Sequence, residues 1–224
     1  MRLRLRNNSL SLFFGALFLA TVLAQSAVGH RAYNAEQVEH GSAAVSYLRY
    51  LTSSDFGQAV MENWQSEFLQ FSFFIFATVW LIQRGSNESK KPEEAGLESD
   101  EQQLVGAHAQ WNSPRWAKAG GVRRWAFSNS LLLVMTTIFF AAWFAQSVTG
   151  WTKFNEEQRA HDGPLVSWGG YVKSSAFWEE TLQNWQSEFL AVGTMAAFTI
   201  YLRQRGSPES KPVGAPHTET GSSG

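Results

Sequence analysis

The residues best placed to do chemistry are two glutamates in one duplicated heptapeptide. The sequence NWQSEFL stands at residues 63–69 and again at residues 184–190, and it supplies Glu67 and Glu188. Each copy leads directly into an apolar run, and the run 68–82 gives only about 22 Å of helix. A bilayer core is about 30 Å thick, so we expect the heptapeptide to complete the crossing and to hold its glutamate at the outer membrane interface.

Two interpretations of these glutamates remain open. An ionisable side chain at membrane depth is costly, and it usually belongs to a pathway or a binding site. In the other interpretation, the glutamates reach the lipid headgroups while neighbouring amides join helices by hydrogen bonds. The candidate set for either role consists of paired polar residues from the two copies: Asn63, Gln65, Glu67, Asn184, Gln186, Glu188, Gln25 and Gln146.

A second polar pair precedes the heptapeptide in each copy. Glu36 and His40 are four residues apart, as are Glu157 and His161, so each pair lies on one face of a predicted short helix. Carboxylate and imidazole groups bind several divalent metals, and histidine also senses pH near neutrality. One pair supplies fewer ligands than a metal site needs, so hydrogen-bonded anchoring of the loop is the alternative. We predict no cofactor.

These residues recur because the chain contains an internal repeat. Residues 8–90 align without a gap to residues 129–211 at a constant offset of 121, with 36 identities in 83 pairs. Each copy holds a long uncharged stretch and then a shorter apolar run, and every proline falls outside these runs, as expected for helices. We therefore predict an all-α membrane protein with four transmembrane helices, arranged as two tandem parallel-repeat helical hairpins with helical outward loops.

The boundaries follow from the repeat and the polarity. The first hairpin repeat covers residues 1–91 with spans at about 9–29 and 64–83, and the second covers 123–211 with spans at about 129–150 and 185–203. Residues 92–122 form a polar cytoplasmic linker and 212–224 a disordered tail, because neither holds enough apolar residues for a core. Ser54 and Ser175 are the predicted N-caps of the second helix in each hairpin.

The first span has a rival interpretation as a signal peptide cleaved after Ala24. The repeat argues against it, because the same AQS sequence recurs at residues 145–147, in the middle of the chain. We therefore predict an uncleaved span.

Charge predicts the orientation and excludes several partners. Thirteen of the 18 lysines and arginines lie in residues 2–6, 84–124 and 203–211, which flank the hairpins, so both termini are predicted to be cytoplasmic and both hairpin loops to face outward from the inner membrane. A net charge of −1 does not create the positive electrostatic potential that attracts nucleic acid. The absence of cysteine excludes disulfides and thiol chemistry. The repeated QRGSxESK segments, 83–90 and 204–211, are interpreted as helix ends with basic flanks or as anionic headgroup sites.

With these motifs in view, the chain resembles an uncharacterised family of small bacterial integral membrane proteins. The resemblance rests on QSxxG at residues 25–29, YNAEQVEH at 33–40, NWQSEFL and QRGSNESK, each with its second copy. It covers nearly the whole chain except the linker and the tail, and it implies no activity, substrate or cofactor. The second copy departs by having Trp151 for His30 and Arg159 for Val38.

The functional expectation is correspondingly coarse. No nucleophile or metal motif accompanies the paired carboxylates, so we predict a protein that is not an enzyme. The favoured role is a structural or interaction component of the bacterial cell envelope, with the lipid bilayer and a second copy of itself or another envelope protein as partners. The alternative is a small ion or solute transporter or channel with a polar pathway between the two repeats.

Overall fold

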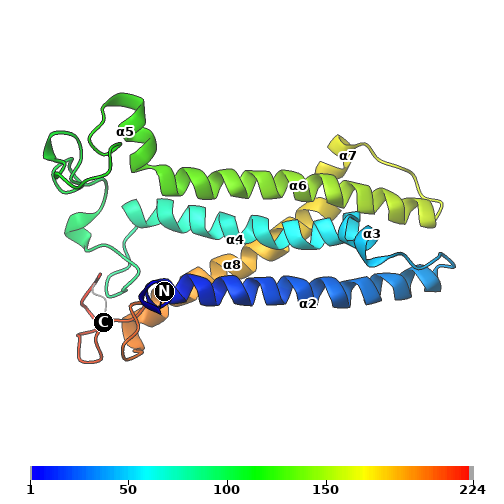
Figure 1. Ribbon diagram of the computed structural model, residues 1–224, viewed down its shortest axis with the longest axis horizontal. Coiled ribbons are helices and arrows are strands. Elements are labelled where there is room, and N and C mark those ends of the chain that lie inside the picture. The colour runs from blue at the N-terminus through cyan, green and yellow to red at the C-terminus, as the bar shows by residue number, and fades with distance from the viewer. Residues whose placement is uncertain (1, 222–224) are drawn as a thin grey trace. The chain divides into compact units, whose positions relative to one another are not determined.

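The computed structural model describes residues 2–221, with side chains from Leu5 onward, and this part of the chain contains helices, turns and loops but no strand. Four long helices dominate it (Figure 1): α2 (Ser9–Glu39), α4 (Ser54–Trp80), α6 (Ser130–Ala160) and α8 (Ser175–Tyr201). The shorter elements are α1 (Arg2–Asn7), α3 (Tyr47–Leu51), η1 (Pro92–Glu94), η2 (Gly106–His108), α5 (Gly121–Ser128) and α7 (Trp168–Val172). The predicted all-helical class is confirmed.

Two of the long helices are long and apolar enough to cross a membrane. They are α2 and α6, each of 31 residues with a window of mean hydropathy 1.9. Helices α4 and α8 have 27 residues each and carry the polar heptapeptide. They are long enough to cross a membrane, but their most apolar stretches are less apolar than those of α2 and α6, and they do not qualify as spans by the same measure. The expectation of membrane-spanning helices is therefore supported for the first helix of each copy.

The long helices extend further than their apolar runs. The sequence predicts separate short helices at residues 33–40 and 154–161, whereas α2 continues to Glu39 and α6 to Ala160 without a break. No proline interrupts either continuation, and a single glycine within a helix costs only about 1 kcal/mol. In the first copy the N-cap is Ser53 rather than Ser54, because the Ser53 hydroxyl accepts the backbone N–H of Phe56 at 3.3 Å.

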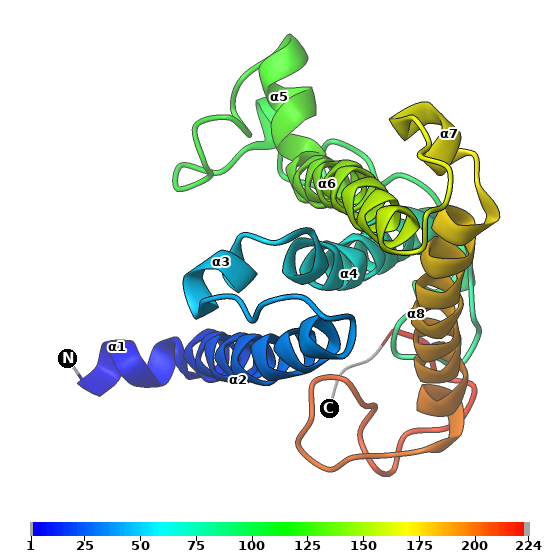
Figure 2. The ribbon, with the colours of Figure 1, turned by 90° about the vertical axis from the view of Figure 1, so that its right-hand side faces the viewer.

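The chain divides into two compact units. Unit 1 comprises Met1–Met61 and Ala145–Ser174, and it includes α2, α3, α7, the start of α4 and the end of α6. Unit 2 comprises Glu62–Phe144 and Ser175–Gly224, with the rest of α4, the start of α6, α5, α8, the linker and the tail. Each unit contains parts of both copies of the repeat. Within unit 1, α3 packs beside α2 (Figure 2).

Candidate functional site

In unit 1, an asparagine holds the loop that follows each long first helix. Asn34 accepts the backbone N–H of Val45 at 2.8 Å and donates its own N–H to the Val45 carbonyl at 3.1 Å. Asn155 makes the same two bonds to Val166, both at 2.9 Å. Because both peptide groups of the valine are satisfied by one side chain, the asparagine fixes the path of the loop.

The substitution of Trp151 for His30 preserves a hydrogen bond. His30 Nε2 lies 2.8 Å from the Val45 carbonyl, and the indole Nε1 of Trp151 donates to the Val166 carbonyl at the same distance. His30 Nε2 also lies 2.9 Å from the Asn34 amide nitrogen, so in the first copy the ring contacts both the loop carbonyl and the asparagine that holds the loop. Two different rings therefore contact the same loop carbonyl at equivalent places, and the departure between the copies keeps this contact.

The serine of the QSxxG motif binds the short helix that follows. The Ser26 hydroxyl lies 2.6 Å from the Tyr47 hydroxyl, and in the second copy Trp168 Nε1 donates to the Ser147 hydroxyl at 3.1 Å. Both serines are buried. Here too the aromatic residue changes while the polar contact remains.

The glycine of the same motif makes room for a tyrosine. A Cβ atom at Gly29 would overlap the Tyr50 hydroxyl, and one at Gly150 would overlap the Tyr171 hydroxyl. Both tyrosines are buried, with 6% and 1% of their surface exposed. The motif therefore docks the loop, a role that sequence reasoning did not assign to Gly29, Tyr50 or their counterparts. The signal was present, because both residues of each pair recur at the offset of 121.

The two heptapeptides contact each other in unit 2. The indole N–H of Trp185, from the second copy, donates to Gln65 Oε1, from the first, at 2.7 Å. The Ser66 hydroxyl donates to the Glu188 carboxylate at 3.4 Å. The interface continues one turn earlier on α4, where the Asn184 amide donates to Glu62 at 2.6 Å. Glu62 was not predicted, because it precedes the repeated sequence and the second copy has glutamine there.

Identical residues of the heptapeptide differ in burial. Gln65 and Ser66 are buried, with 0% and 1% exposed, whereas Gln186 is exposed. Glu67 is exposed while Glu188 is half-buried, and the two carboxylates repel each other as like charges. The structure thus brings Gln65, Asn184 and Glu188 into one contact region, with Glu67 in electrostatic range, and leaves Gln186 outside it. Asn63 is exposed on α4.

Several buried polar atoms of unit 2 lie beside this contact. Gln65 Nε2, Thr181 Oγ1 and Trp143 Nε1 have no hydrogen-bond partner among residues 2–221. The Trp143 ring packs 5.7 Å from the Trp185 ring, which itself bonds Gln65, and stacks 6.1 Å from Phe177. Unpaired polar atoms in an aromatic setting are costly, so they would stabilise a polar species that reached them.

The remaining pair of predicted glutamines, one from each copy, also differs in burial. Gln25 is exposed on α2, whereas Gln146 on α6 has 0% of its surface exposed. Neither Oε1 nor Nε2 of Gln146 has a hydrogen-bond partner within the described chain. Both glutamines belong to unit 1, apart from the heptapeptides of unit 2.

Of the predicted Glu and His pairs, the two histidines contact each other across the copies. The His40 and His161 rings lie 6.0 Å apart and meet edge to face at 86°. Glu157 pairs with Lys153 at 3.8 Å, and His40 contacts the backbone oxygen of Glu36 rather than its carboxylate. No group of three or more His, Asp or Glu residues within the described chain is placed to hold a metal ion.

An ion pair lies near the start of α4 in unit 1. Asp55 is 3.8 Å from the Lys153 ammonium, and neighbouring Ser54 donates to Glu156 at 2.7 Å. Burial raises the pKa of Asp55, and the Lys153 charge opposes that rise. These bonds join a residue pair of the first copy to a residue pair of the second.

The QRGSxESK segments fold into equivalent turns. The Ser89 hydroxyl accepts the backbone N–H of Gln83 at 2.9 Å, and Ser210 does the same for Gln204 at 2.9 Å. Gly85 has a φ of 90°, a left-handed conformation that favours glycine. Helix α4 ends at Trp80, so this glycine shapes the turn after the helix rather than capping it.

Lys211, which ends the second of these segments, is buried among backbone carbonyls. It is 1% exposed, and its ammonium donates to the carbonyls of Gly85, Pro216, His217 and Glu219 at 2.6, 3.2, 3.1 and 2.9 Å. Burial lowers the pKa of Lys211. The equivalent Lys90 is less buried and donates to the Gly96 carbonyl and the Glu98 carboxylate.

The tail therefore carries order that its composition does not predict. Thr220 accepts the backbone N–H of Gly85 at 2.8 Å, and the N–H of Gly221 reaches the Ser86 carbonyl at 3.1 Å. Residues 212–221 of the segment predicted to be disordered follow this hydrogen-bonded path, and residues 222–224 lie outside the described residues. The physical reason is that backbone groups, rather than apolar side chains, make the contacts.

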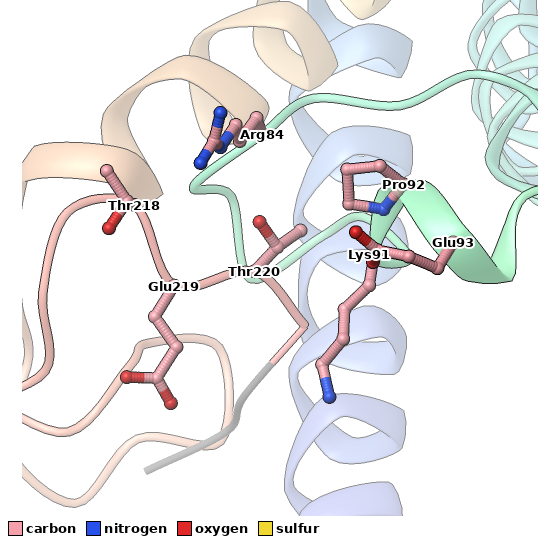
Figure 3. A pocket seen from close by; sticks show the side chains of 7 residues that line it. All are labelled: Arg84, Lys91, Pro92, Glu93, Thr218, Glu219 and Thr220. Atoms are coloured by element: carbon pink, nitrogen blue, oxygen red, sulfur yellow. The ribbon is translucent and has the colours of Figure 1, made fainter.

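A pocket of about 430 Å³ lies between the first QRGSxESK turn, the start of the linker and the tail (Figure 3). Its lining includes the cations Arg84 and Lys91, the carboxylates Glu93 and Glu219, and the hydroxyl of Thr220. Two positive and two negative groups leave no net charge. The pocket is therefore not selective by charge for an anionic headgroup, which was one of the two interpretations of this motif.

Comparison with known proteins identifies a family. A family model described as a domain of unknown function, DUF6766, matches residues 1–222. No curated protein and no solved structure matches the chain. The matched range includes both copies of the repeat, the linker and the tail up to residue 222. The expected membership of an uncharacterised family is thus confirmed, and the chain belongs to DUF6766, a family of unknown function.

Proposed function

We propose that this protein is an integral membrane protein and a structural or interaction component of the bacterial cell envelope. The observation that carries the proposal is the surface of α2 over residues 10–24, which is largely apolar and exposed around the helix. Its large exposed side chains include runs of three, Leu12 to Phe14 and Leu17 to Leu19, which point in successive directions around the helix. A helix that is apolar all round needs an apolar solvent, and a lipid bilayer provides one.

The proposed topology has four crossings, with α4 and α8 as the second and fourth. Each has 27 residues and is about 40 Å long, which exceeds a bilayer core of about 30 Å. The heptapeptides support this placement because their buried polar atoms contact each other rather than lipid. The charge distribution supports a cytoplasmic position for both termini and the linker, with the α2–α4 and α6–α8 loops outside the inner membrane.

A non-enzymatic role is supported by what the duplicated residues do. The shared asparagines, serines and glycines of unit 1 are used to hold loops. Those loops also present apolar side chains to solvent, among them Leu48 at 75% exposed, Leu165 at 53% and Trp168 at 42%. Exposed apolar groups on an ordered loop suit a protein partner, and we propose a second copy of this chain.

Topology is testable directly because the chain contains no cysteine. Single substitutions Ser42→Cys, in the α2–α4 loop, and Ser99→Cys, in the linker, are labelled with a membrane-impermeant maleimide on intact cells. We expect labelling at position 42 only. Labelling at position 99 but not at 42 would reverse the orientation, and labelling at both would contradict the four-crossing topology.

Self-association has a separate test. Leu48→Cys is oxidised mildly in native membranes, and Leu97→Cys, an exposed leucine of the linker, serves as the matched control. We expect a disulfide-linked dimer for Leu48→Cys and a monomer for Leu97→Cys. Monomer at both positions, or equal dimer at both, would rule out a second copy at this loop.

One observation favours a second candidate, a polar pathway. Glu67 and Glu188 come from different copies and are close enough to repel, and Gln65 Nε2 beside them is buried without a partner in the described chain. We propose ion or proton transfer along this contact as the alternative function. Like-charged carboxylates that share a contact region are a common element of such pathways.

The pathway is tested by flux in reconstituted vesicles. Glu67→Gln and Glu188→Gln, separately and together, are compared with Glu62→Gln, which alters a structural contact to Asn184. If the pathway operates, flux falls in the first three variants and persists in Glu62→Gln. Unchanged flux with normal insertion in all four variants would leave the structural role in place.

A further inference from the structure

We propose that His40 and His161 together bind a transition-metal ion such as Zn²⁺, with one ligand from each copy of the repeat. The two histidines are equivalent residues in the repeat, and they follow the last turns of α2 and α6. Both belong to unit 1, both are exposed, and their rings lie 6.0 Å apart. This inference is independent of the proposed membrane function.

The spacing of the rings fits a shared ion. With Zn–N bonds of about 2.0–2.1 Å and tetrahedral angles, the centres of two imidazoles on one ion lie roughly 5 Å apart. The observed 6.0 Å is about 1 Å longer, and the rings are turned edge to face. His161 is exposed, so a change of its rotamer closes this gap while the His40 ring keeps its position and neither helix moves.

The protonation of His40 leaves a nitrogen free for a metal. His40 Nδ1 is 3.0 Å from the backbone oxygen of Glu36, which only accepts, so Nδ1 carries the proton and Nε2 carries the lone pair. Histidines that bind metals usually donate their other N–H to a carbonyl or carboxylate in this way. The backbone bond to Glu36 thus orients the ring for a ligand.

The surrounding charge favours a cation. Within four residues of the two histidines the chain carries four carboxylates against one basic group: Glu36, Glu39, Glu157 and Asp162 against Arg159. Glu157 is partly neutralised by Lys153 at 3.8 Å. The remaining excess is negative, and imidazole ligands suit zinc, copper and nickel rather than calcium or magnesium.

Two imidazoles leave the other coordination positions to water, so the ion is exchangeable rather than permanent. Its effect is to join the ends of α2 and α6, because neither histidine alone provides the site. Binding therefore needs both copies of the repeat in their native arrangement, which ties metal affinity to the fold of unit 1.

The test is calorimetric titration of Zn²⁺ into the purified full chain, after removal of any histidine tag. We expect one ion per chain, and a loss of affinity of at least about tenfold in both His40→Ala and His161→Ala. Even the loss of a residue that only hydrogen-bonds a metal ligand usually lowers metal affinity about tenfold or more. His108→Ala, an exposed histidine of the linker, is the matched control and keeps wild-type affinity.

Three results would overturn the proposal: no binding by the wild type, wild-type affinity in either single variant, or equal loss in His108→Ala. Misfolding is excluded by melting each variant without zinc, where exposed residues should leave the midpoint unchanged. A second readout is the melting midpoint with zinc, which rises for the wild type and for His108→Ala but not for the other two variants.

Discussion

Asn34 and Asn155 make the same pair of hydrogen bonds to a valine 11 residues later, whereas Gln65 and Gln186, in an identical heptapeptide, are buried and exposed. The first contact closes within one copy, so the shared asparagine and valine make the same contact although most residues between them differ. The second contact joins the two copies, and Trp185 of one approaches Gln65 of the other without a reciprocal bond from Gln186. Duplication therefore preserves local contacts and lets contacts between the copies diverge.

The largest expected effect tests what the copies share. Gly150→Ala places a Cβ into the Tyr171 hydroxyl, and Gly29→Ala does the same at Tyr50. Overpacking of this kind costs about 1–3 kcal/mol of unfolding free energy, which we expect in both variants. The measurement is denaturant or thermal unfolding in detergent.

Gly193→Ala is the matched control, because nothing lies within 4 Å of its added Cβ in α8. Replacing Tyr171 by Phe in the Gly150→Ala background removes the overlapping oxygen and should recover part of the lost stability. If Gly150→Ala is as stable as Gly193→Ala, the glycine has no docking role.

The next effect tests where the copies differ. Gln65→Ala leaves the Trp185 N–H without its acceptor at a buried site, which costs about 1–2 kcal/mol. Gln186→Ala, at the equivalent exposed position, should fall within about 0.5 kcal/mol of wild type. Equal costs, measured by the same unfolding assay, would show that the two heptapeptides have equivalent surroundings.

A smaller effect concerns the ring nitrogens. Trp151→Phe and His30→Phe each remove the ring nitrogen that contacts a valine carbonyl, and each should cost about 0.5–1.5 kcal/mol. Trp111→Phe, at a linker position 91% exposed, is the control and should be neutral. Clearly unequal costs at positions 30 and 151 would mean that the two rings are not interchangeable at this contact.

The smallest effect is a pH dependence. Burial, and then the charge of Glu209, raise the pKa of Glu88 above its ordinary 4.5. An acid with a raised pKa in the folded state adds stability below 4.5, and that contribution is lost as pH rises through the raised pKa. Glu88→Gln and Glu209→Gln should both make the unfolding midpoint depend less on pH over this interval. The exposed Glu94→Gln should keep the wild-type slope, and a slope unchanged in Glu88→Gln would exclude this group as its source.

Sequence reasoning succeeded where information is local. The helical class follows from uncharged runs between polar loops, and the repeat follows from aligned identities. The continuation of α2 to Glu39 was not predicted, because a polar segment after an apolar run suggests a new element even when no proline separates them. The docking of Tyr50 on Gly29 was within reach, since the second copy repeats both residues at the same spacing.

The candidate site was predictable only in part. Sequence reasoning selected the polar residues of the heptapeptide, and the structure joins Gln65, Asn184 and Glu188 across the copies. The sequence could not distinguish Gln65 from Gln186, because their neighbours along the chain are the same and only packing between distant segments differs. The contacts of the tail were beyond sequence reasoning for a related reason, since one lysine and several backbone groups provide contacts that a hydropathy pattern does not record.

The burial of Lys211 has a consequence for the order of assembly during synthesis. The turn at Gly85 gives its carbonyl to a residue 126 positions later and its N–H to one 135 positions later. A ribosome that has completed the first copy has therefore not yet made either partner. The first turn therefore lacks these two contacts until Lys211 and Thr220 emerge, so a segment that follows the second copy completes a turn of the first copy.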